Sequence, residues 1–330
     1  MGHIGRMRLI LNLALAAVAL TQSQGGFPVI GKKTVVQFLS AKESQPLITA
    51  QDDFVKRLSP FDRAARLKVG RPVSEAEYLA FVGKNVRDWT EPEIQKLRAV
   101  IDEIPSLPVE FPFPPAIQLI KTTGVEEGNA AYTRGTAIMI PVELLAKPPP
   151  DLKKLVCHEM FHILSRANPA LREKLYSVIG FTECEEIELP PELASRKITN
   201  PDAPRNDHFI QLKIGDESFL AVPVLFSTSE QYDEKRGGEF FAYLKFQFLV
   251  VEKTSQPGRL KAVSRTGSPR LVEARAVTGF FERIGRNTDY IIHPEEILAD
   301  NFALLVLGGE KVASPEILEK MKTILFPKVK

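Results

Sequence analysis

The chain has 330 residues, of which 44% are hydrophobic and 25% are charged, a balance typical of a globular protein that buries a large core. Its 43 basic and 41 acidic residues leave a net charge of only +2. No block of basic residues occurs, and this charge pattern argues against a nucleic-acid-binding protein.

The first 25 residues have the pattern of a secretory signal peptide. A basic start with Arg6 and Arg8 precedes a twelve-residue apolar run, residues 9–20, that only Asn12 interrupts. Small residues and a polar segment follow, as at a cleavage site. The run is too short to cross a bilayer, which needs about 20 residues. We expect cleavage after about residue 25, a secreted or periplasmic mature protein and no membrane span in it. An uncleaved anchor or a buried helix is the alternative.

Residues 26–105 predict a mainly helical N-terminal lobe. Ser74 to Glu77 and Thr90 to Glu93 have the capping-box form, and an apolar-periodic run follows each. Two shorter helices are predicted over 51–58 and 61–68. Prolines between residues 105 and 115 then require extended chain. Turn residues separate the next apolar runs, and these predict strands over 116–121, 129–133 and 137–141.

The segment 151–166 predicts a helix with Asp151 at its N-cap, and it contains the sequence His158-Glu159-Met160-Phe161-His162. Residues four apart share one face of a helix, so the two imidazoles lie one turn apart with Glu159 beside them. Most other positions are apolar, which places the helix inside the protein. Buried His and Glu side chains must be paired or bind a metal. The H-E-x-x-H pattern is typical of zinc hydrolases, in which the Glu acts on water. The alternative is a solvated helix with two unrelated histidines.

After this helix the sequence predicts a further helix, a strand-rich insertion at about 200–270 and two closing helices. The predicted helices cover 169–179, 294–307 and 315–325, and the strands cover 208–213, 218–226 and 239–251. The residues 253–269 are predicted as a loop. Cys157 and Cys184 form either a disulfide or two buried thiols. The pattern as a whole predicts an α+β fold, with residues 106–330 as one domain.

A catalytic zinc site needs a third protein ligand. The extended histidine motif of the metzincins is excluded, because Ser165 and Asn168 stand where it needs Gly and His. Glu296 is the preferred candidate, since Asp300 lies one turn further on the same face and could accept the ring N–H of a ligating histidine. The rival is a nearby acidic cluster, which two prolines follow and in which no Asp lies one turn beyond any Glu. Its members are Glu183, Glu185, Glu186 and Glu188.

In these features the chain resembles the gluzincin zinc metallopeptidases, of which thermolysin is the best-known representative. The motif helix, the Glu296-x-x-x-Asp300 spacing and the segment Asn129-Ala130-Ala131-Tyr132 carry the resemblance. It implies a zincin-like core of a sheet and the H-E-x-x-H helix. It also implies that Asn129 and Ala130 contact the backbone of an extended substrate as an edge strand does.

The position of the transition-state donor does not transfer, because the strand-rich insertion separates the motif helix from Glu296. His208 is preferred as the donor, since Asp207 beside it could orient its ring. The alternatives are Tyr232, Tyr243 and Tyr290.

We therefore expect a secreted zinc-dependent peptidase that acts on peptides or proteins. One Zn²⁺ per chain would be held by His158, His162 and Glu296, and it would lower the pKa of a bound water. Glu159 would act as general base, and Asp300 would orient His158. Two alternatives remain open: a zinc amidase acting on a non-peptide or cell-wall amide, and an exported binding protein that zinc stabilises without catalysis.

Overall fold

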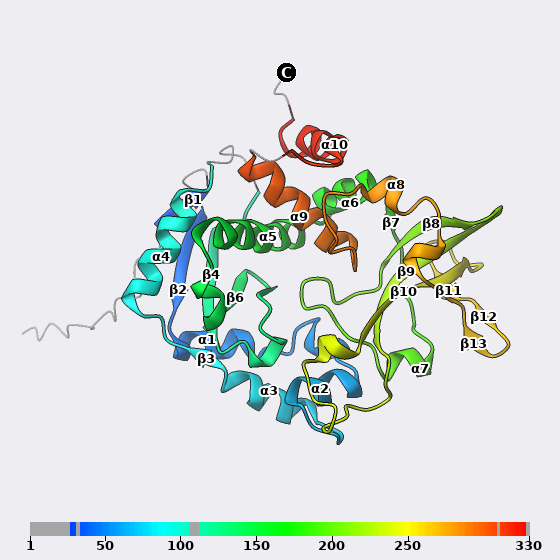
Figure 1. Cartoon of the computed structure of the whole chain (residues 1–330), viewed down its shortest axis with the longest axis horizontal. Coiled ribbons are helices and arrows are strands. Elements are labelled where there is room, and N and C mark those ends of the chain that lie inside the picture. The colour runs from blue at the N-terminus through cyan, green and yellow to red at the C-terminus, as the bar shows by residue number, and fades with distance from the viewer. Residues whose placement is uncertain (1–26, 31–33, 106–111, 309–310, 328–330) are drawn as a thin grey trace, which may run out of the picture.

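The computed structural model describes residues 27–30, 34–105, 112–308 and 311–327. The predicted signal peptide falls within residues 1–26 and lies outside this part of the chain. The described residues combine helices with two six-stranded sheets and a two-stranded one, which is consistent with the predicted α+β class (Figure 1). No helix among them is long and apolar enough to span a membrane.

The first sheet has the strand order β1-β2-β4-β6-β5, and β3 pairs with β4. β2, β4 and β6 are parallel, whereas β5 runs antiparallel to β6 at the edge of the sheet. The strands are β1 (Phe27–Ile30), β2 (Thr34–Leu39), β3 (Val86–Arg87), β4 (Ala116–Thr122), β5 (Tyr132–Arg134) and β6 (Ala137–Pro141). The predicted strands β4 and β6 are confirmed. The segment expected to be a helical lobe also contributes β1, β2 and β3, which the sequence analysis missed.

Helices cover both faces of this sheet, because successive side chains of a strand point to opposite faces. Leu119 and Ile138 lie in one core with side chains of α4 (Glu91–Asp102) and α5 (Pro149–Ala167). Ile120 and Met139 lie in a second core with residues from the other helices of the N-terminal segment. These helices are α1 (Ala41–Ile48), η1 (Val55–Arg57), α2 (Pro60–Leu67) and α3 (Glu75–Gly83). The sheet is therefore buried on both faces.

The second sheet is antiparallel, with the order β11-β10-β9-β8-β7, and β14 pairs with β10. Its strands are β7 (Phe181–Glu183), β8 (His208–Ile214), β9 (Glu217–Ser227), β10 (Leu244–Lys253), β11 (Leu260–Ala262) and β14 (Leu271–Val272). The predicted strand 239–251 begins later than expected, because η4 (Phe240–Tyr243) precedes β10. The predicted loop 253–269 contains β11 and the hairpin β12 (Ser264–Arg265) and β13 (Ser268–Pro269).

The motif helix α5 packs along α9 (Pro294–Leu307), and this contact joins distant parts of the chain (Figure 1). The prediction that Asp151 is the N-cap of α5 was wrong, because the helix already begins at Pro149. The carboxylate of Asp151 lies in the first turn, where the helix dipole favours it. The N-cap of α9 is His293, whose ring accepts a hydrogen bond from the Glu295 amide at 3.1 Å. This bond satisfies an amide of the first turn of α9, which has no acceptor within the helix.

The remaining helical elements are short, apart from two longer helices near α5 and α9. They are η2 (Val125–Glu127), η3 (Val142–Ala146), α6 (Pro169–Val178), α7 (Pro191–Ala194), η5 (Ala274–Ala276), α8 (Phe281–Ile284) and α10 (Pro315–Leu325). The predicted bounds of α9 and α10 are confirmed. Ser314 is the N-cap residue of α10, but its hydroxyl makes no hydrogen bond to the first turn of the helix. It accepts a hydrogen bond from the Arg286 amide instead.

Candidate metal centre

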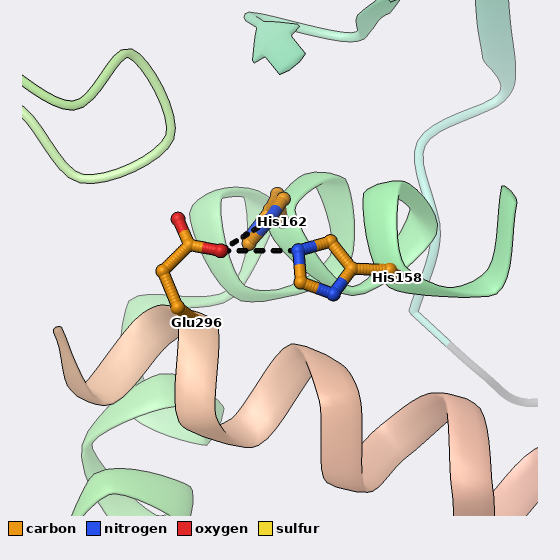
Figure 2. Close-up of side chains that lie close together, drawn as sticks. All are labelled: His158, His162 and Glu296. Carbon is orange, nitrogen blue, oxygen red and sulfur yellow. Dashed lines mark hydrogen bonds and ion pairs between the residues drawn. The ribbon is translucent and has the colours of Figure 1, made fainter. Parts of the chain in front are cut away.

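The two histidines of α5 and Glu296 of α9 meet at one point (Figure 2). The Oε2 atom of Glu296 lies 3.0 Å from Nε2 of His158 and 3.5 Å from Nε2 of His162. One potential ligand atom from each residue lies within 4.8 Å of the other two. His162 and Glu296 are buried, and His158 is partly buried. The structure therefore brings together the three residues that the sequence analysis selected as ligands.

Asp300 contacts the ring nitrogen of His158 that points away from Glu296. Nδ1 of His158 lies 2.9 Å from Oδ1 of Asp300, and the hydroxyl of Thr288 donates to the other oxygen of the same carboxylate. When Nδ1 donates its proton to Asp300, Nε2 carries the lone pair and faces Glu296. This is the orienting contact expected from the spacing of Glu296 and Asp300.

A second carboxylate, from Glu295, holds the ring of His162 in the same way. Nδ1 of His162 lies 3.0 Å from Oε1 of Glu295. The hydroxyl of Ser165 donates to Oε1, and the hydroxyl of Tyr176 donates to Oε2 at 2.5 Å. The sequence analysis missed Glu295, although the acidic pair after Pro294 could have indicated it, since neighbouring helical residues point in different directions and can hold different partners.

This arrangement leaves acceptor atoms facing one another. When each ring carries only its Nδ1 proton, the two Nε2 lone pairs and the Glu296 carboxylate converge, and such groups repel unless a further proton or a cation lies between them. Nε2 of His162 and Oε2 of Glu159 are buried without a hydrogen-bond partner, which costs about 1–3 kcal/mol for each uncompensated group. Two imidazole nitrogens and one carboxylate oxygen match the protein ligands of a catalytic zinc site. The donor set therefore fits a divalent cation such as zinc.

Burial and neighbouring charges set the protonation of the cluster. Burial alone would lower the pKa of His158, but Asp300 and Glu296 outweigh it and raise this pKa to about 10. Burial would raise the pKa of Glu296, but His162 and His158 hold it well below its usual range. Burial, and then the charge of Asp202, raise the pKa of Glu159. Glu159 therefore accepts a proton more readily than Glu296 does.

Three further residues lie at the cluster. The amide nitrogen of Asn200 donates to Oε1 of Glu296 at 2.6 Å. A carboxylate oxygen of Asp202 lies within 4.8 Å of ligand atoms of both Glu159 and His162. The ring of Tyr290 stacks on that of His158, with centroids 6.2 Å apart. Asn200 and Asp202 belong to a segment without helix or strand, and no periodic pattern could have indicated them.

Among the proposed transition-state donors, only Tyr290 lies at the cluster. The preference for His208 was wrong: its Nδ1 lies 2.6 Å from Asp207 and its Nε2 3.0 Å from Glu173, so carboxylates occupy both ring nitrogens. The hydroxyls of Tyr232 and Tyr243 donate to main-chain carbonyls of the loop between β9 and β10.

Asn129 and Ala130 do not form the expected edge strand. Asn129 has a positive φ of 63°, and its amide donates to the Gly124 carbonyl at 2.8 Å. The amide of Ala130 donates to the Glu127 carbonyl at 3.1 Å. Both residues therefore belong to a turn, because local bonds already use their N–H groups. The edge strand begins at Tyr132.

The rival acidic cluster is exposed and does not approach the histidines. All four of its glutamates lie at the surface, and one of them forms an ion pair of 2.5 Å with Arg57. Both cysteines are free thiols, with Cys157 buried and Cys184 partly buried. No match was found when the chain was compared with models of protein families, with curated proteins and with solved structures.

Proposed function

We propose that this protein is a zinc-dependent metallopeptidase of the gluzincin type, with a zincin-like core formed by the first sheet, α5 and α9. One observation carries the proposal. A glutamate that is 138 residues from the first motif histidine in the sequence lies 3.0 Å from its Nε2, and a separate carboxylate holds Nδ1 of each imidazole. An H-E-x-x-H sequence that arose by chance would not require three such partners.

The proposed ligands are His158, His162 and Glu296. Zinc bound there would lower the pKa of a water and polarise the scissile carbonyl. The Oε2 atom of Glu159 is buried without a hydrogen-bond partner beside these ligands. It can accept a proton from water and pass it to the leaving nitrogen. The raised pKa of Glu159 suits this exchange, because a general base works best when its pKa is near the ambient pH.

Tyr290 is the proposed donor to the oxyanion. Its side chain is exposed, and its ring stacks on that of His158. Burial, and then the carboxylates of Glu296 and Asp202, raise its pKa well above the usual tyrosine value. The hydroxyl therefore keeps its proton and can donate it to developing negative charge.

The substrate proposed for this centre is a peptide or protein outside the cytoplasm. Export is a proposal that the apolar run at residues 9–20 supports. Zinc content and casein hydrolysis, measured on the wild type and on Glu159→Gln, test the function. Glu185→Gln, which changes an exposed glutamate, is the matched control.

We expect one zinc per chain in all three proteins. Hydrolysis should fall at least about 100-fold in Glu159→Gln alone, because the variant loses its general base. Hydrolysis at the wild-type rate in Glu159→Gln would remove the general-base role. Bound zinc without hydrolysis of casein or of a peptide library would favour a zinc-stabilised binding protein.

A further inference from the structure

Residues 199–204 cross the candidate centre, and we call this segment the strap. Its first residue, Thr199, is fixed to the N-terminal helices: the amide donates to Asp62 at 2.8 Å and the hydroxyl to the Arg57 carbonyl at 3.0 Å. The next residue, Asn200, donates to Glu296 at 2.6 Å. The strap is therefore bound to the N-terminal segment at its first residue and to a proposed metal ligand at its second.

Asp202 of the strap occupies the open edge of β5. Its Oδ1 accepts hydrogen bonds from the amide of Thr133 at 2.7 Å and from its hydroxyl at 2.6 Å. Arg166 reinforces the contact, donating to the Thr133 hydroxyl at 3.0 Å and to the Asp202 carbonyl at 3.2 Å. β5 is the edge strand, and the outward Thr133 amide is the group to which an added strand would hydrogen-bond. The chain itself fills that position.

The strap also divides the space along β5. A cavity of about 40 Å³ reaches the residues before Thr133, including Ala131 and Tyr132. A larger cavity of about 330 Å³ reaches the residues after it, Arg134 and Gly135. Pro201 and Asp202 line both cavities, so these two residues form the wall between them. An extended peptide on β5 would have to pass through this wall.

We propose that the strap is an autoinhibitory element. Beside His162 and Glu159, Asp202 occupies the position on β5 at which the substrate backbone would form its hydrogen bond. Displacement of the strap joins the two cavities into one groove along β5, open to an extended peptide chain. The identity of that occupant rests on the proposed function, whereas the capping of β5 by Asp202 does not. A ligand of the groove binds only the fraction of molecules in which the strap is displaced, so its apparent affinity is lowered by that fraction.

Asp202→Ala tests the proposal, with Asp53→Ala as the matched control. Asp53 is exposed and lines the same larger cavity, and its carboxylate pairs with Arg57 and Arg205 rather than with Thr133. The first measurement is amide hydrogen exchange of β5 in metal-free protein. We expect faster exchange at Thr133 in Asp202→Ala and unchanged exchange in Asp53→Ala, because only the first loses the acceptor. Unchanged exchange in Asp202→Ala would refute the capping.

The second measurement is the affinity of the zinc-loaded protein for a trialanine hydroxamate. We expect Asp202→Ala to bind this probe about tenfold more tightly than the wild type and the control. Asp202→Asn, which keeps one oxygen acceptor for Thr133, should be intermediate. Equal or weaker binding in Asp202→Ala would show that Asp202 does not block the groove. If no form binds zinc, the proposed function fails, and the exchange at Thr133 still decides whether Asp202 caps the strand.

Discussion

The two carboxylates behind the imidazoles differ in their surroundings, so their removal should weaken zinc binding unequally. Loss of an acceptor for the free N–H of a metal-ligating histidine typically weakens metal affinity about 10–100-fold, or about 1.4–2.7 kcal/mol. Glu295 is buried and accepts from Ser165 and Tyr176 as well as from His162. In Glu295→Gln an NH₂ group replaces one carboxylate oxygen. This group is a donor, so it cannot accept a hydrogen bond from the neighbouring donors. We therefore expect an effect near 100-fold.

Asp300 is less critical because its side chain keeps 21% exposure, and water can replace part of what Asp300→Asn loses. We expect an effect near about tenfold. The assay is competition for zinc against a chromophoric chelator at fixed pH, with thermal unfolding of the metal-free variants as a check on folding. Glu316→Gln, at an exposed position of α10, is the control. Unchanged affinity in both variants, or a larger loss in Asp300→Asn, would refute the reasoning.

Three further predictions concern catalysis, acid stability and the core. Tyr290→Phe should lower kcat on casein about 10²–10³-fold with KM unchanged, as removal of an oxyanion donor does; an unaltered kcat contradicts the donor role. Burial, and then the charge of His208, lower the pKa of His293 to about 4, so the folded state binds this proton less readily than the unfolded chain. The stability that neutral His293 contributes is fully present above about pH 6.5 and is lost as the pH falls towards 4. Urea titrations of the metal-free protein should show that the free energy of unfolding falls by up to about 3 kcal/mol over this range, and His293→Asn should abolish this loss. An equal dependence of the free energy of unfolding on pH in both proteins contradicts it. Arg66→Met should cost about 3–5 kcal/mol in urea unfolding, because it leaves the carboxylates of Asp62 and Glu127 buried without their cation; a cost below about 1 kcal/mol contradicts the pairing.

The sequence alone predicts best the elements whose ends are encoded locally. Proline at the first turn and a stop residue bound α9, so its range was predicted without error. Because α5 and α9 are both helices, the spacing of their polar residues was enough to select His158, His162 and Glu296. That these faces meet is a property of the packing, which no local pattern encodes.

Contacts between distant segments were the part that the sequence could not provide. The strand β2 was missed because its partner in the sheet, β4, begins at residue 116, and a short apolar run is ambiguous without its partner. Asp202 was missed for a related reason. It lies in an irregular segment, and only the folded chain brings it to Thr133 of β5. The preference for His208 failed because Glu173, far from it in the sequence, pairs with the ring nitrogen that Asp207 leaves free.

The most direct test of the central claim is equilibrium zinc binding to the wild type and to Glu296→Ala, with Glu183→Ala as the control. Glu183 is exposed and belongs to the rival acidic cluster. If Glu296 is the third ligand, the wild type and the control bind one zinc per chain with equal affinity. Glu296→Ala should then bind it at least about 100-fold more weakly, since loss of a ligand costs more than loss of an orienting partner. Equal zinc affinity in Glu296→Ala and the wild type, or no zinc binding by the wild type, would contradict the account.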